Sequence, residues 1–179
     1  MKNKLLQVFF LSFFIQSGVH AATPGQTYIG GGYHFGILSD NDVDATANPS
    51  GLEVRGGKYL SDTVAIEGQF MIGMGEDTIE VFGTSVDVKL NNLLSVFLRG
   101  EMKLSPTANI YGLIGFSKGE IELSTFAGSV TEDDSGLSFG FGVDTEMSKG
   151  MYIGGRFVSY IDDDADYSGI NINITKYLD

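Results

Sequence analysis

Apolar and polar residues alternate with a period of two through most of the chain, and this pattern constrains the fold more than any other feature of the sequence. In residues 64–73, for example, Ile66 and Phe70 fall on one face, whereas Glu67 and Gln69 fall on the other. Successive side chains of a β-strand point to opposite faces, so this periodicity predicts strands. Eight segments show it: residues 27–36, 52–60, 64–73, 94–104, 110–117, 137–147, 151–161 and 169–178.

The connections between these segments alternate in length. Tight turns are predicted at residues 60–63, 104–107 and 147–150, and longer polar loops at residues 37–50, 74–86, 119–135 and 162–166. Short turns at one end and longer loops at the other are typical of transmembrane barrels. A tilted strand of about 9–11 residues crosses a bilayer, and an even number of antiparallel strands closes without free edges. We therefore predict an all-β fold, an eight-stranded antiparallel up-and-down transmembrane β-barrel.

A soluble eight-stranded barrel such as a lipocalin has the same alternation with its faces reversed. Composition separates the two architectures. Charged residues make up only 19% of the chain, and it contains 25 glycines. The more polar faces hold Gly, Tyr, Asn and few charges, where a water-exposed exterior would be rich in Lys and Glu. This composition favours the membrane barrel.

The order of basic, apolar and small residues at the N-terminus is typical of a secretion signal. Lys2 and Lys4 precede an apolar run at residues 5–15, and the residues Val19-His20-Ala21 fit a small-x-small cleavage site. We predict a signal peptide at residues 1–21 and a barrel domain at residues 22–179; the alternative is a membrane anchor, for which the apolar run is short. Removal of the signal changes the formal net charge from −12 to −14. That acidity argues against a nucleic-acid partner.

Four stretches resemble a known family: residues 28–33 (Tyr-Ile-Gly-Gly-Gly-Tyr), 57–67, 109–115 and 167–174. They are similar to the small outer-membrane β-barrel proteins of Gram-negative bacteria, the porin-family group that includes the OmpA transmembrane domain, OmpX and the opacity proteins. The resemblance implies an outer-membrane location and insertion by the barrel-assembly machinery. It also assigns the C-terminal assembly signal to Tyr167, Gly169, Ile172 and Ile174. Family members usually end on an aromatic residue, whereas this chain ends in Leu178 and Asp179.

The face of each strand that carries the charges is predicted to line the interior, which side chains fill in a barrel of eight strands. Charges buried there must be paired and hydrogen-bonded, because desolvation of an unpaired charge is costly. We predict a salt-bridge network in the lumen, made by Glu53, Arg55, Glu67, Arg99, Glu101, Asp144, Glu146 and Arg156. Such a network would plug the lumen; the alternative is a conducting or gated pore.

An enzymatic role of the kind known among eight-stranded barrels would require a suitable histidine. Some of these barrels are lipid A deacylases or palmitoyl transferases that use Ser and His with an acid. After signal removal, His34 is the only histidine, and it lacks the His-x-Ser spacing of the deacylases. We predict that His34 is a hydrogen-bonded interior residue. No nucleophile–base pair emerges from the sequence, so we predict a non-enzyme without catalytic residues.

Acidic residues gather in the predicted long loops, whereas Lys58, Lys103, Lys149 and Lys176 lie toward the other end. Carboxylate oxygens suit Ca²⁺ and Mg²⁺, which makes two acidic runs candidate sites for weakly bound divalent cations. The candidate ligands are Asp40, Asp42, Asp44, Asp162, Asp163 and Asp164. The alternative interpretation is a solvated acidic surface. No resident cofactor is predicted.

These inferences combine into one functional expectation. We predict a monomeric, non-enzymatic outer-membrane protein with a structural or adhesion-like role. Its expected partners are outer-membrane lipids, lipopolysaccharide and host or phage surfaces. A small porin-like channel is the main alternative, and a lipid A-modifying enzyme is the third.

Overall fold

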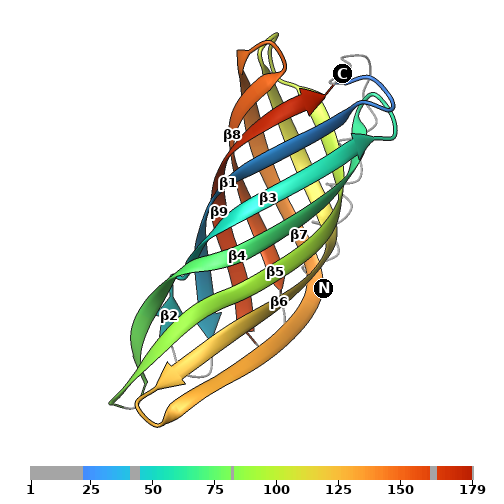
Figure 1. Ribbon diagram of the computed structural model, residues 1–179. Coiled ribbons are helices and arrows are strands. Elements are labelled where there is room, and N and C mark those ends of the chain that lie inside the picture. The colour runs from blue at the N-terminus through green and yellow to red at the C-terminus, as the bar shows by residue number, and fades with distance from the viewer. Residues whose placement is uncertain (1–21, 41–44, 82, 162–164, 179) are drawn as a thin grey trace, which may run out of the picture.

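The computed structural model describes residues 22–40, 45–81, 83–161 and 165–178, and these residues form strands and turns (Figure 1). None of them belongs to a helix long and apolar enough to cross a membrane. The predicted signal peptide, residues 1–21, lies outside the described residues. The strands are β1 (Thr27–Asp40), β2 (Ala45–Ala47), β3 (Ser50–Tyr59), β4 (Val64–Val81), β5 (Thr84–Lys103), β6 (Ala108–Thr125), β7 (Gly128–Ser148), β8 (Met151–Ile161) and β9 (Ala165–Leu178).

The sheet closes on itself. From β3 to β9 each strand pairs antiparallel with the next one in the sequence, and β1 pairs with β2, with β3 and, along its whole length, with β9. The short strand β2 continues β3, because β1 pairs with both in the same register, as Leu38↔Ala47 and Phe35↔Ser50 show. Pro49, which has no N–H to donate, interrupts the ladder between them. The predicted eight-stranded antiparallel barrel is therefore confirmed, with one of its strands divided in two.

The two faces of the wall differ as the alternation predicts. Large apolar side chains are exposed on the outer face of every barrel strand, as in Ile29, Val54, Phe70, Val96, Ile114, Phe139, Ile153 and Ile172. Polar and charged side chains are buried inside, as in His34, Arg55, Glu67, Arg99, Ser117, Asp144, Arg156 and Asn173. An apolar exterior around a polar interior is the arrangement of a barrel that lies in lipid.

Two of the predicted loops are strands in the structure, so their prediction as loops is wrong. Residues 74–86 and 119–135 continue the strands β4 to β7, which project beyond the other strands at one end of the barrel (Figure 1). The chain reverses only near Gly83 and at residues 126–127. Part of the predicted loop 37–50 likewise belongs to β1 and β2. Strands that project into water need no apolar face, so their alternation is harder to see in the sequence.

At the other end the predicted short turns are confirmed. Leu60 N–H donates to the Val64 carbonyl across the β3–β4 turn at 2.8 Å, and Leu104 N–H donates to the Ala108 carbonyl across the β5–β6 turn at 2.8 Å. The β7–β8 turn narrows to residues 149–150, where Gly150 adopts a left-handed φ of 69°. The connections at this end of the barrel are thus short turns, whereas long hairpins project from the other end.

A change of register marks the point where the hairpin β4–β5 leaves the barrel. Ile72 pairs with Asn92, but Glu76 pairs with Lys89, so β4 holds one extra residue there. Such bulges bend a strand and increase its twist. Gly73 lies inside this bulge, and a Cβ at this position would be 1.5 Å from the Leu90 carbonyl oxygen. The absence of a side chain at residue 73 is what allows the two backbones to approach.

Candidate functional site: the barrel interior

Arg99 of β5 lies at the centre of the buried charges. Its Nε donates to Glu101 Oε2 at 2.8 Å, and its Nη2 lies 2.7 Å from Asp144 Oδ2. Its Nη1 is 3.5 Å from Glu67 Oε2. The guanidinium carbon also lies 3.6 Å from the centroid of the Tyr111 ring, which is a cation–π contact. Arg99 therefore joins residues of β4, β5, β6 and β7.

Arg156 of β8 connects the opposite part of the wall. Its Nη2 is 2.8 Å from Glu53 Oε2, and its Nη1 is 2.6 Å from Glu67 Oε1. These ion pairs join β8 to β3 and β4, which are not its neighbours in the sheet. The side chains of all three residues are fully buried, so the pairs cross the lumen without contact with solvent.

Arg55 of β3 has a different set of partners. Its Nη2 donates to Asn173 Oδ1 and to Thr175 Oγ1, at 2.6 Å for the latter. The nearest carboxylate, that of Asp144, is 3.9 Å away. Asn173 and Thr175 were not among the predicted network residues, although the alternation along residues 169–178 places both on the lumen face. A network predicted from charged residues alone does not include these two neutral hydrogen-bond acceptors.

The structure brings together seven of the eight predicted network residues. Three guanidinium groups, those of Arg55, Arg99 and Arg156, meet the four carboxylates of Glu53, Glu67, Glu101 and Asp144. Glu146 does not join them. It is partly exposed near the end of β7, and its Oε1 accepts a hydrogen bond from the Gly150 N–H of the β7–β8 turn at 3.1 Å.

A tyrosine cluster covers the network toward the short turns. It is formed by Tyr28, Tyr59, Ala65 and Tyr177. Tyr28 donates its hydroxyl hydrogen to Glu67 Oε2 at 2.6 Å, and Tyr59 donates to Glu101 Oε2 at 2.8 Å. The hydroxyls of Tyr59 and Tyr177 are 2.9 Å apart. This layer satisfies part of the buried charge and fills the end of the lumen with aromatic rings.

A second, larger cluster fills the lumen toward the projecting hairpins. Its buried members are Met71, Leu90, Leu93, Phe97, Tyr111, Leu113, Val158, Tyr160 and Tyr167. Leu90 and Leu93 both point inward, although an uninterrupted strand would separate them onto opposite faces. The register shift between Leu90 and Asn92 allows this, because β5 holds an extra residue there. Alternation along single strands does not predict this apolar layer.

His34 is fully buried, and its ring contacts Tyr160 and Tyr167 of the apolar cluster. Its Nδ1 is 2.8 Å from Asn171 Oδ1, and its Nε2 is 2.6 Å from the Tyr167 hydroxyl. The structure thus places His34 in a hydrogen-bonded interior position, as expected for it. Gly169 packs against the imidazole, where a Cβ would lie 2.2 Å from His34 Cε1.

The predicted assembly signal forms the last strand of the barrel. Tyr167 and Gly169 face the lumen, whereas Ile172 and Ile174 are exposed on the outer face of β9. This strand pairs with both β8 and β1 and thereby closes the sheet. The residues of the signal therefore contribute to the wall on both of its faces.

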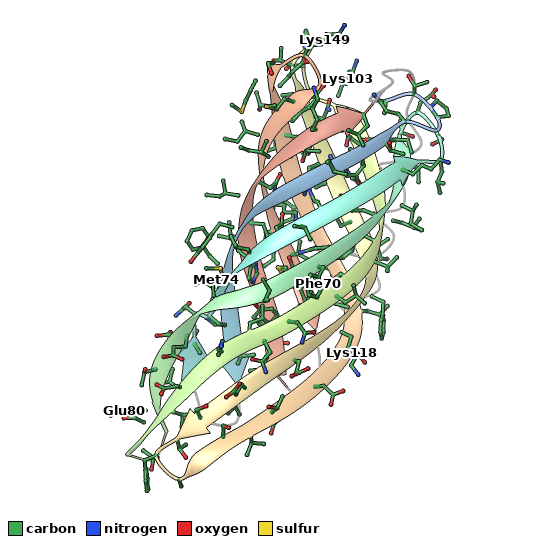
Figure 2. The ribbon with its side chains drawn as sticks, in the orientation of Figure 1. Phe70, Met74, Glu80, Lys103, Lys118 and Lys149 are labelled. Carbon is green, nitrogen blue, oxygen red and sulfur yellow. The ribbon has the colours of Figure 1, made fainter. Side chains whose placement is uncertain are left out.

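The acidic residues at the far end lie on projecting strands. Glu76 and Asp77 belong to β4, and Glu132, Asp133 and Asp134 belong to β7. Figure 2 shows Glu80 at this end of the molecule and Lys103 and Lys149 at the opposite end. Acidic residues therefore gather on the projecting strands, and these two lysines lie at the end with the short turns.

One exposed ion pair joins the projecting strands β6 and β7. Lys118 Nζ is 2.8 Å from Asp133 Oδ2, and both side chains are mostly exposed. The hydrogen bond and charge of Lys118 lower the pKa of Asp133, and those of Asp133 raise the pKa of Lys118.

The predicted cation ligands fall largely outside the described residues. Asp42, Asp44, Asp162, Asp163 and Asp164 are not described, and Asp40 is the last residue of β1. Across the described ranges, no group of three or more His, Cys, Asp or Glu side chains could hold a metal ion. The divalent-cation sites stay a prediction.

Comparison with known proteins identifies one family whose model matches most of the chain. The model of the family described as "Outer membrane protein beta-barrel domain" matches residues 8–175. No curated protein sequence is significantly similar to the chain.

Several solved structures share the fold at low sequence identity. Ail, the attachment invasion locus protein of Yersinia pestis, superposes with a TM-score of 0.64 at 17% identity over 87% of this chain and 100% of Ail. OprG from Pseudomonas aeruginosa gives 0.66 at 12% identity over 90% and 99% of the two chains. Neisserial surface protein A gives 0.63 at 8% identity over 84% and 96%.

Proposed function

Because the chain belongs to the outer membrane protein beta-barrel domain family, we propose that it is a non-enzymatic surface protein of the Gram-negative outer membrane. Residues 1–21 direct its secretion, and the barrel-assembly machinery inserts residues 22–179 as a monomer. The barrel is plugged by its own side chains and anchors the acidic projecting hairpins at the cell surface. Its role is structural or adhesion-like.

One observation carries the plugged barrel. The ion pairs of Arg99 and Arg156 reach across the lumen, and all of their carboxylate partners are fully buried. A tyrosine cluster lies on one side of this layer and an apolar cluster on the other. A permeating ion would have to separate these pairs and displace both clusters. A porin-like conduit is therefore the less favoured function.

The surface role rests on the projecting strands. Their acidic residues are Glu76, Asp77, Glu80, Asp87, Glu120, Glu122, Glu132, Asp133 and Asp134, against the cations Lys89 and Lys118. Phe126 is 96% exposed between β6 and β7. An acidic surface with an exposed aromatic side chain suits a partner with basic groups, or divalent cations that bridge to lipopolysaccharide phosphates.

The comparison with Ail bears on the kind of partner. Ail has been crystallised in complex with the heparin analogue sucrose octasulfate. The acidic hairpins of this chain would repel such a polyanion. If the protein is an adhesin, we therefore expect it to bind surfaces other than sulfated sugars.

Shortened hairpins test the surface role. Asn-Gly is placed between Asp77 and Val88, and a second Asn-Gly between Ile121 and Glu132; both pairs face each other in the sheet, so a two-residue turn fits. Cells that produce the full and the shortened proteins are compared for attachment to epithelial monolayers and to lipopolysaccharide-coated surfaces. We expect the shortened protein to reach the membrane at the same level and to lose attachment. Equal attachment would contradict an adhesive role for the hairpins.

A further inference from the structure

The outer wall of the barrel carries a shallow groove. A groove of about 290 Å³ lies over β3, β4 and β5, and its outward-facing lining is Val54, Gly56, Gly68, Phe70, Leu94 and Val96. Gly56 and Gly68 are directly paired and form its floor. The next outward-facing pair, Val54 and Phe70, forms one of its walls; Phe70 is marked in Figure 2.

The outward-facing pair on the other side of the floor carries a charge. Lys58 pairs with Ile66 and lies two residues from Gly56 on the same face of β3, a separation of roughly 7 Å along the strand. Lys58 is exposed, and no carboxylate of the described residues forms an ion pair with it. The other outward-facing residues of β3, β4 and β5 around the groove are uncharged. On the flanking strand β6, Lys118 pairs with the groove residue Leu94, and its charge is engaged by the ion pair with Asp133. Lys58 is thus a cation that lies beside an apolar groove and has no ion-pair partner among the described residues.

The level of Lys58 in the wall indicates the ligand. β3 ends at Tyr59, so Lys58 lies next to the short turns, which face the periplasm in barrels of this type. A lysine at this level meets lipid phosphates, and an apolar groove deeper in the wall meets acyl chains. The separation of roughly 7 Å between Lys58 and Gly56 suits a single lipid whose phosphate meets the lysine and whose acyl chain enters the groove.

We propose that Lys58 and the groove over Gly56 and Gly68 bind one anionic glycerophospholipid of the periplasmic leaflet. The Lys58 ammonium contacts the phosphate, and one acyl chain lies along the two glycines between Phe70 and Val96. The inference rests on the proposed outer-membrane location. It adds a defined lipid site to the apolar outer wall.

Two variants separate the contributions of the headgroup and the acyl chain. Lys58→Gln removes the cation and leaves the groove. Gly68→Leu fills the groove, and the fold accommodates it because no atom lies within 4 Å of a Cβ at this position. Lys103→Gln is the control for charge, since Lys103 is an exposed lysine at the same end. Gly155→Leu is the control for bulk, because Gly155 lies on β8 and its nearest atom would be 3.9 Å away.

Native mass spectrometry of the full secreted chain, released from detergent with palmitoyl-oleoyl phosphatidylglycerol or phosphatidylcholine, measures the binding of the first lipid. We expect Lys58→Gln to weaken phosphatidylglycerol binding about fivefold and to leave phosphatidylcholine binding unchanged. Gly68→Leu should weaken the binding of both lipids. The two controls should behave as the unmodified protein does.

Equal lipid binding by all variants would overturn the proposal, and so would loss of a protein dimer, rather than of bound lipid, on Gly68→Leu. Heat-modifiable mobility of each variant shows that it is folded. Cell fractionation tests the outer-membrane location separately. A protein found in the outer membrane without the lipid preference would therefore refute the site and leave the proposed function intact.

Discussion

At the scale of single residues, alternation along the strands places charged side chains on the inner face, and closure of the barrel pairs them across the lumen. Alternation places Glu53, Glu67 and Arg156 on inward faces, and this much is readable from the sequence. Their pairing is not, because Arg156 meets Glu53 across 103 residues of chain, and only closure of the barrel brings them together. Arg55 shows the limit most clearly: its side chain binds Asn173 and Thr175 more closely than any carboxylate.

Removal of Arg99 should be strongly destabilising. Arg99→Met leaves Glu101 and Asp144 buried without their guanidinium, and breaking a buried pair in this way costs about 3–5 kcal/mol. Urea unfolding in phospholipid vesicles measures the free energy of unfolding. Lys118→Met is the matched control, because it breaks an exposed pair and should leave the unfolding midpoint unchanged. Similar midpoints for both variants would refute the central position of Arg99.

The exposed pair of Lys118 and Asp133 makes a pH prediction. Lys118 holds the pKa of Asp133 below its ordinary value, so the pair is intact above the ordinary carboxyl pKa and is lost as the pH falls through the lowered one. Lys118→Met should therefore raise the pKa of Asp133 in a carboxyl NMR titration at low salt. An unchanged titration would show that the two side chains do not interact in solution.

At the scale of elements, the projecting hairpins are the main difference between expectation and structure. Residues 74–86 and 119–135 are polar, and polarity suggested loops. They are strands because segments such as Thr78–Val81 and Val86–Val88 are rich in β-branched residues and pair with each other beyond the apolar wall. Outside lipid, a strand can be polar on both faces, so hydrophobic periodicity does not mark it.

The bulge at the base of the β4–β5 hairpin makes a second stability prediction. Gly73→Ala would place a Cβ against the Leu90 carbonyl, and we expect it to lower the free energy of unfolding by about 1–3 kcal/mol. Gly68→Ala on the same strand adds a Cβ in open space and should leave stability unchanged or improve it. The same urea assay compares the two. Equal effects would mean that the close approach at Gly73 does not hold the hairpin in place.

At the scale of the whole molecule, more of the structure could be predicted from the sequence than at the scale of individual contacts. Strand number, closure and the direction of each face follow from alternation and from the need to satisfy every backbone group in lipid. The apolar layer of Leu90 and Leu93 could not be predicted in the same way, because it depends on a register shift that no single strand reveals.

A closed barrel in the outer membrane has two further observable properties. The folded protein should migrate faster than the boiled protein on gels run with detergent, because the hydrogen-bonded sheet resists unfolding without heat. It should also sediment with the outer membrane after cell fractionation. A protein recovered from the periplasm without a mobility shift would contradict the membrane location and favour a soluble, lipocalin-like barrel.

The most direct test of the plugged barrel is single-channel recording of the purified, refolded protein in planar bilayers. The buried pairs of Arg99 and Arg156, with the layers above and below them, predict a flat baseline without stable openings. Openings of reproducible size in the unmodified protein would contradict the plug and make the chain a small channel.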